Sequence, residues 1–254
     1  MKNAHTSSSF RNAAALAAFA EGIKDGLHPD DIGGKAVQSF ARGLKHVDSA
    51  RLPKDQTKRS EVFSLAKDAS IDTATVSAAI MAWGGMNQRY SPKFFDTAKD
   101  GWLEVADGIR KGDLDRGAAY ARFAGLRAAN NLYGAGPAYF TKLIYFLTPR
   151  PSEDYPNAYI MDQWAGCSIN LLIGDELVKM DVTRTWKTGA EEAGSSFRVS
   201  DANTAVEYEN FCSKVDALRA HFDISPDQVD RKMIATGGKK KSSWRKYVIE
   251  NRRI

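Results

Sequence analysis

The feature that most constrains the fold is a pair of glycines, Gly134 and Gly136, placed where one helical pattern stops and another starts. Apolar residues recur at helical spacing over 115–131 and again over 137–147. Glycine tolerates the positive φ of a very tight turn, and Pro137 suits the first position of a new helix. The sequence therefore predicts a helix–turn–helix whose second helix presents free backbone N–H groups, which suit a phosphate.

Helical periodicity runs through most of the remaining chain, whereas the strand signal is poor. The other segments with helical spacing are 13–23, 32–44, 59–69, 73–82, 92–109, 163–173 and 203–222. Ser225 to Gln228 has the pattern of a capping box. The stretches 148–156 and 184–200 read as irregular, and 237–243 reads as a basic linker before a docked segment at 244–248. We therefore expect an all-α protein.

Composition narrows the class of protein. With 254 residues, 43% hydrophobic and 26% charged, the chain suits one large soluble domain or two small ones. It has no apolar run long enough to cross a membrane and no signal-like start, so we expect a cytoplasmic protein, associated with the nucleoid if it is bacterial. Cys167, Cys212 and four scattered histidines offer no metal-binding spacing, so we expect no metal and no cofactor.

The net charge of +5 is modest, but basic residues gather near the end of the chain. Lys240 and Arg245 belong to this group, and Trp244 and Tyr247 alternate with the cations. Such a cluster is often a solvated surface. It also favours a polyanion partner, and we take Lys240 and Arg245 as candidate contacts to a nucleic acid duplex.

Asp162 directly precedes the apolar helical segment 163–173. The ordinary interpretation is an N-cap, because an aspartate there accepts hydrogen bonds from the first N–H groups of a helix. A catalytic carboxylate is the other interpretation. The two are compatible, since capping would fix the rotamer and keep the group ionised.

The turn Leu132-x-Gly134-x-Gly136, followed by Asp162, resembles the signature of the helix–hairpin–helix DNA glycosylases. Gly134 to Lys142, with Trp83-Gly-Gly and Trp244 to Val248, is similar to a bacterial group with an 8-oxoguanine-glycosylase-like fold. The likeness is specific over 118–175 and loose over 70–117 and 200–250. It implies two helical lobes with a cleft between them. We expect an N-terminal helical segment 1–68, a glycosylase-like core 69–236 with the hairpin 132–147, and a basic segment 237–254.

The resemblance also implies roles for individual residues. The turn would bind one DNA phosphate, Asp162 would face the sugar of a flipped nucleotide, and Arg89 would fill the gap left in the duplex. The residues of the phosphate turn would be Gly134, Gly136 and Ala138. The base pocket would be formed by Trp83, Gly84, Met86, Asn87 and Gln88. The alternative is that the glycines of this loop only cap the end of the helix 73–82.

One position departs from the family. Lyase-competent members carry a nucleophilic lysine where this chain has Ala138, and here the nearest lysine is Lys142, about one helical turn further on. Lys142 would enter the same pocket from one turn deeper, or it would be a lysine whose ammonium reaches solvent.

The expected function is excision of an oxidised base, first of all 8-oxoguanine, from double-stranded DNA by a monomer. Abasic-site lyase activity would be added if Lys142 reaches C1′. Two alternatives stay open, a non-catalytic helix–hairpin–helix DNA-binding module and a helical protein-interaction domain.

Overall fold

The computed structural model describes residues 10–25, 32–97, 101–150, 158–186, 194–234 and 241–252. These residues are mostly helical, which confirms the expected all-α class. The chain divides into two compact units: unit 1 contains residues 1–27 and 161–254, and unit 2 contains residues 28–160. The predicted boundaries after residues 68 and 236 do not coincide with this division, and they stay predictions. The N-terminal helix packs with helices from the C-terminal part of the chain, so it does not form a segment of its own.

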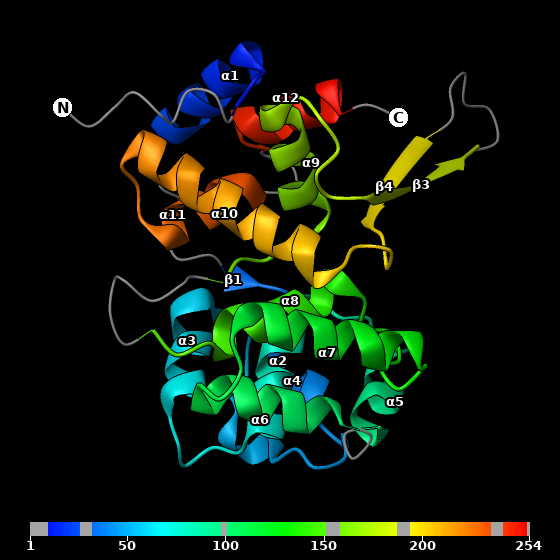
Figure 1. Ribbon diagram of the computed structural model, residues 1–254. Coiled ribbons are helices and arrows are strands. Elements are labelled where there is room, and N and C mark those ends of the chain that lie inside the picture. The colour runs from blue at the N-terminus through cyan, green and yellow to red at the C-terminus, as the bar shows by residue number, and fades with distance from the viewer. Residues whose placement is uncertain are drawn as a thin grey trace. The chain divides into compact units, whose positions relative to one another are not determined.

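Unit 2 is built around α4 (Thr73–Trp83), whose residues are all buried (Figure 1). Asp72 caps this helix, because its carboxylate accepts the backbone N–H of Thr75 at 2.8 Å. The helices that pack directly against α4 are α2 (Val37–Ala41), α3 (Arg59–Lys67), α6 (Trp102–Lys111) and α8 (Pro137–Leu147). The remaining elements of the unit are β1 (Ile32–Gly33), η2 (Ser49–Arg51), β2 (Thr57–Lys58), α5 (Ser91–Asp96) and α7 (Arg116–Ala128).

Unit 1 is organised around α9 (Gln163–Ile173), whose inner face is buried. Ser168 of α9 ties two neighbouring segments together. Its hydroxyl donates to the carbonyl of Met233 at 3.1 Å and accepts the indole N–H of Trp244 at 2.9 Å. The helices that contact α9 are α1 (Ala13–Lys24), α10 (Ala205–Phe222), α11 (Pro226–Ile234) and α12 (Ser243–Asn251).

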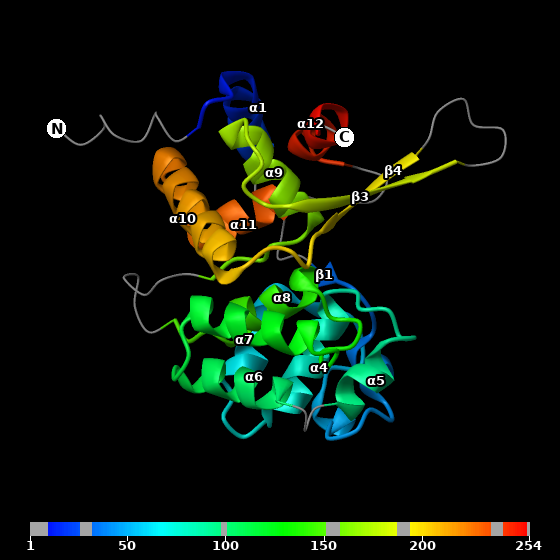
Figure 2. The same cartoon turned by 45° about the vertical axis from the view of Figure 1, so that its right-hand side comes forward.

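A β-hairpin also belongs to unit 1, and it corrects the expectation of an irregular stretch at 184–200. β3 (Met180–Thr185) pairs antiparallel with β4 (Gly194–Val199). Figures 1 and 2 show this hairpin extending away from the helices of its unit. Cross-strand apolar pairs occur only in its inner half, where Met180 faces Val199 and Val182 faces Phe197. The outer pairs are polar or glycine, so the sequence lacks the alternation by which strands are found.

The other helical predictions were mostly accurate. The segments 137–147 and 163–173 match α8 and α9, and the docked segment at 244–248 lies within α12. Two were wrong. The segment 32–44 contains only the short α2, because Gly34 adopts φ +67° against the end of α4. The segment 92–109 is two helices, because Gly101 adopts φ +105° before α6.

Arg110 holds the turn between α3 and α4. Its guanidinium donates to the carbonyls of Ala66 at 2.8 Å, Asp68 at 2.6 Å and Ile71 at 2.6 Å. These carbonyls lie where α3 ends, so they have no partner within a helix. Burial lowers the pKa of Arg110, and nearby carboxylates oppose that lowering, Asp107 most strongly.

We predict that Arg110→Met lowers the free energy of unfolding by about 2–3 kcal/mol, because three carbonyls lose a charged donor. Urea unfolding monitored by circular dichroism measures this. Lys67→Met is the control: Lys67 is an exposed cation at the end of α3, and its loss should change stability by less than about 0.5 kcal/mol. Equal stability of the two variants would contradict this role for Arg110.

Candidate functional site

The glycine turn in unit 2 has the predicted form, with one difference. Gly134 adopts φ +72°, in the left-handed region that favours glycine. Gly136 has φ −77° and ψ −173°, which is extended backbone, so the positive φ of the tight turn is confined to Gly134. Leu132 and Ala135 are buried and anchor the turn, and Pro137 is the first residue of α8.

The start of α8 has free backbone donors. No side chain caps this helix. Among the described residues, no acceptor bonds to the backbone N–H of Gly134, Gly136 or Ala138. A helix N-terminus with free N–H groups favours an anion, since the peptide dipoles add to the hydrogen bonds. The predicted phosphate role of this turn therefore has the donors that it requires.

Sequence reasoning missed two residues that contact this turn, Tyr90 and Lys93. A Cβ built on Gly134 would lie 2.6 Å from Cβ of Tyr90, so the turn rests closely on that residue. The ammonium of Lys93 on α5 lies 3.9 Å from the centre of the Tyr133 ring, and Tyr133 precedes Gly134. Lys93 therefore adds a positive charge beside the turn. No sequence motif links residue 93 to the turn, because the proximity arises from the packing of α5.

The predicted base-pocket loop divides into a buried and an exposed part. Trp83 is 7% exposed and meets the Phe146 ring edge-to-face at 4.9 Å, and Met86 is fully buried. Neither side chain presents a face on which a base could stack in this conformation. By contrast, Asn87, Gln88 and Arg89 are exposed, and the Asn87 side chain accepts the backbone N–H of Arg89 at 2.9 Å. The exposed part leads into Tyr90 and hence toward the glycine turn.

Lys142 is only 8% exposed, and its side chain turns back toward the start of α8. Nζ donates to the carbonyl of Ala138 at 2.6 Å and lies 5.3 Å from the centre of the Tyr139 ring. The aliphatic stem passes over Gly84: a Cβ on that glycine would lie 2.7 Å from Cδ of Lys142. Gly84 therefore provides the space that the lysine stem occupies. This contact joins Lys142 to the loop at the end of α4.

Asp162, in unit 1, is the N-cap of α9. Its Oδ1 accepts the backbone N–H groups of Trp164 at 2.8 Å and of Ala165 at 3.0 Å. The predicted capping is thus confirmed, and it uses one oxygen. No donor among the described residues hydrogen-bonds to Oδ2. The side chain is half-buried. The carboxylate is therefore held in one rotamer by Oδ1 while Oδ2 is left available.

The two tail residues predicted to contact a duplex have different outcomes. Lys240 lies outside the described residues. Arg245 is 6% exposed, and its guanidinium lies 3.4 Å from the centre of the Trp164 ring. Its Nη2 also donates to the carbonyl of Ile234. Such a buried guanidinium is not a surface contact, so the burial of Arg245 does not fit the predicted role.

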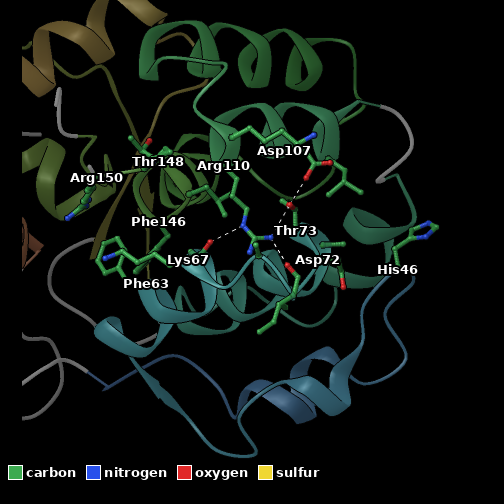
Figure 3. Close-up of a pocket in the computed structure, with 18 residues that line it drawn as sticks. His46, Phe63, Lys67, Asp72, Thr73, Asp107, Arg110, Phe146, Thr148 and Arg150 are labelled. Atoms are coloured by element: carbon green, nitrogen blue, oxygen red, sulfur yellow. Dashed lines mark hydrogen bonds between the residues drawn. The ribbon is translucent and has the colours of Figure 1, made fainter. Parts of the chain in front are cut away.

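Unit 2 also contains a cavity of about 1000 Å³, which lies away from the glycine turn (Figure 3). Phe63, Phe146 and Arg150 line one part of it, and Asp107 and Arg110 line another. It opens at the start of α4 and the end of α8, whereas the glycine turn and Gly84 lie at the opposite ends of those helices. Each of these helices has 11 residues and is about 16 Å long. The cavity is therefore separate from the glycine turn.

Three further structural findings concern the expected chemistry. Both cysteines are buried free thiols. In the part of the chain that the structure describes, no three histidine, cysteine, aspartate or glutamate side chains are grouped so as to hold a metal ion. No helix there is long and apolar enough to cross a membrane.

Comparison with known proteins identifies a family. The sequence model of a family described as "putative 8-oxoguanine DNA glycosylase OGG-like protein" matches residues 36–233, which is more than half of the chain. The matched region contains α2 to α11, so it includes the glycine turn, Lys142 and Asp162. No curated protein and no solved structure matches the chain significantly.

We predict that Lys93→Ala weakens binding to undamaged duplex DNA and makes the slope of log K against log salt shallower by about 1, since one phosphate contact is lost. Fluorescence anisotropy from low to moderate salt measures both quantities. Lys67→Ala is the control, because Lys67 is an exposed cation of the same unit that lines the separate cavity. Identical salt slopes for the two variants would remove Lys93 from the interface.

Proposed function

This chain belongs to the OGG-like family, and from that membership we propose that it removes an oxidised base, first of all 8-oxoguanine, from double-stranded DNA. The observation that carries the proposal is the state of Asp162. Its Oδ1 holds the start of α9 through two backbone N–H groups, and Oδ2 has no donor among the described residues. A carboxylate oxygen that is held in a fixed rotamer and accepts no hydrogen bond would be available to act on a substrate.

The chemistry follows from where charge develops. As the N-glycosidic bond breaks, positive charge builds on the sugar, and a fixed carboxylate close to C1′ would stabilise it. Because the two hydrogen bonds to Oδ1 fix the rotamer of Asp162, little reorganisation is needed at the moment of reaction. Oδ2 would face the sugar, or would orient a water molecule that attacks C1′.

The glycine turn would supply the sequence-independent part of binding. The N–H groups of Gly134, Gly136 and Ala138 would donate to one phosphate, and Lys93 would add a charge beside it. Asn87 and Gln88 are exposed amides on the loop that leads to this turn, so they would read the edge of the extruded base. Arg89 would enter the gap in the duplex. Trp83 and Met86 would support this loop from the core.

We predict that Asp162→Asn lowers base excision by roughly 100-fold or more, since the amide cannot stabilise positive charge. Duplex affinity should stay within a few fold, because Asp162 is not a phosphate contact. Asparagine also caps helices, so the fold should be kept. Single-turnover assays on an 8-oxoguanine duplex, with alkaline cleavage of the product, measure the loss. Normal excision by this variant would leave Asp162 as a helix cap only, whereas no excision by the unmodified protein on any oxidised duplex would favour a non-catalytic DNA-binding module.

A second activity, cleavage of the abasic strand, is favoured by the position of Lys142. Its Nζ hydrogen-bonds to the carbonyl of Ala138, the residue that replaces the lysine of lyase-competent members. The amine therefore reaches back to the turn of helix from which that lysine would project. We propose that Lys142, once deprotonated, attacks C1′ of the ring-opened abasic sugar and forms a Schiff base, with the aldehyde oxygen leaving as water. Loss of a C2′ proton then drives β-elimination, which breaks the bond between C3′ and its oxygen and releases the 3′ phosphate.

We predict that borohydride traps the protein on lesion DNA as a covalent adduct, and that Lys142→Gln removes the adduct. Gly84→Ala should lower trapping roughly 10- to 100-fold, since its Cβ would displace the lysine stem. The matched control is Gly125→Ala, because a Cβ at that helical position meets nothing within 4 Å. Trapping that survives in Lys142→Gln would transfer the role to another amine. Base release without any trapping would make the enzyme monofunctional.

A further inference from the structure

The β3–β4 hairpin has two faces of different character. Successive side chains of a strand point to opposite faces, and the register pairs Met180 with Val199 and Val182 with Phe197. Trp186 directly follows β3, and the same alternation places it with Arg184. We call this side of the hairpin the aromatic face, and its residues are Met180, Val182, Arg184, Trp186, Phe197 and Val199. The opposite face is polar and contains Asp181, Thr183, Thr185 and Arg198.

The base of the aromatic face packs against the first turn of α9. Phe197 and Val199 are buried, and β4 contacts α9. On β3, the sulfur of Met180 would lie 3.0 Å from a Cβ built on Gly166, so the strand and the helix approach closely there. The backbone N–H of Gly166 donates to the carbonyl of Asp162 at 2.8 Å. The hairpin therefore starts beside the helical turn that Asp162 caps, within the same unit.

Further from α9, the aromatic face is exposed to solvent. Trp186 is 72% exposed and Val182 is 40% exposed, and they are two of the four large hydrophobic side chains exposed in the described part of the chain. Arg184 lies between them and is exposed, and no hydrogen bond or ion pair engages it among the described residues. On the opposite face, by contrast, Arg198 forms an ion pair with Asp181 at 2.9 Å. The aromatic face thus offers a cation and an apolar surface to a partner.

The hairpin has the dimensions of a ribbon that fits a DNA groove. Its sheet has two strands among the described residues, and Figures 1 and 2 show it extending away from the helices of unit 1. The major groove of B-DNA, about 12 Å wide, admits a two-stranded ribbon. An antiparallel strand rises about 3.4 Å per residue, so Trp186 lies about 20 Å from Met180. That length spans about six base pairs.

We propose that the β3–β4 hairpin enters the major groove of duplex DNA beside the nucleotide held at Asp162. Arg184 donates to a phosphate, and Trp186 packs on base edges within about six base pairs of that nucleotide. The proposal rests on the proposed function, since it takes duplex DNA as the substrate.

Charge and continuity favour DNA over a protein partner. Tryptophan and arginine are common in protein interfaces as well. Among the described residues, however, the aromatic face carries a positive charge and no carboxylate, which suits a polyanion. The same face leads from Trp186 to the first turn of α9, so a duplex with one nucleotide at Asp162 lies within reach of the hairpin.

Matched variants on the two faces test this. Trp186→Ala and Arg184→Gln alter the aromatic face, whereas Thr183→Ala and Arg198→Gln alter the opposite face of the same hairpin. Fluorescence anisotropy on an 8-oxoguanine duplex of two helical turns, about 20 base pairs, measures affinity and its salt dependence. Methylation of guanine N7 by dimethyl sulfate reports on the major groove, since N7 lies there. Single-turnover excision at saturating protein is measured in parallel.

Trp186→Ala should weaken duplex binding roughly 10-fold, because a desolvated tryptophan contact is lost. Arg184→Gln should weaken it a few fold and make the slope of log K against log salt shallower by about 1. Both variants should lose protection of guanine N7 on one side of the lesion, within about six base pairs. Excision at saturating protein should stay unchanged, since the hairpin does not touch the reacting bond. Thr183→Ala and Arg198→Gln should bind within about two-fold of the unmodified protein, since an exposed ion pair contributes little.

Unchanged affinity and unchanged N7 protection in Trp186→Ala and Arg184→Gln would overturn the inference. An equal loss in Arg198→Gln also overturns it, because the two faces would then be equivalent. If Trp186→Ala changes only the oligomeric state of the protein, the face binds a second copy of the chain and the inference fails. A protein that excises no oxidised base, yet loses duplex affinity with Trp186→Ala, would support the role of the hairpin and refute the proposed function instead.

Discussion

The structure depends on how two helix starts satisfy their first backbone N–H groups. At α9 the donors are satisfied internally, because Oδ1 of Asp162 accepts two of them. At α8 no side chain caps the helix, since a glycine and a proline stand at its start. The first arrangement fixes a carboxylate and the second leaves a place for an external anion. One chemical requirement, met in two ways, thus yields the two kinds of group on which the proposed function depends.

Much of this was accessible from the sequence because it is local. Helix stops, N-caps and tight turns are encoded within a few residues, so α8, α9 and the capping by Asp162 could be predicted. Contacts between distant segments could not. Lys93 reaches Tyr133 through the packing of α5, and the stem of Lys142 crosses Gly84 at the end of α4. The β3–β4 hairpin was not predicted from the sequence because its outer strand pairs lack apolar alternation.

Burial explains why charge counts along the chain were a weak guide to the interface. Arg245 was expected on the surface from its basic neighbours, yet its guanidinium is covered by Trp164 and anchored to Ile234. Lys232 is similar: its Nζ donates to the carbonyl of Gly22 at 2.8 Å, and burial lowers its pKa. Such cations stabilise the ends of helices. A basic segment is therefore evidence for a polyanion partner only if basic residues remain exposed once the buried ones are left out of the count.

Counting only exposed basic residues changes which surface is expected to bind a DNA duplex. In unit 2, Arg89 is exposed on the loop that leads to Tyr90, and the ammonium of Lys93 lies over the Tyr133 ring beside Gly134. Both cations belong to segments whose sequence is not notably basic. Packing of α5 brings Lys93 beside the turn, where the N–H groups of Gly134, Gly136 and Ala138 have no acceptor among the described residues. Phosphate recognition would then arise from helix geometry first and from side-chain charge second.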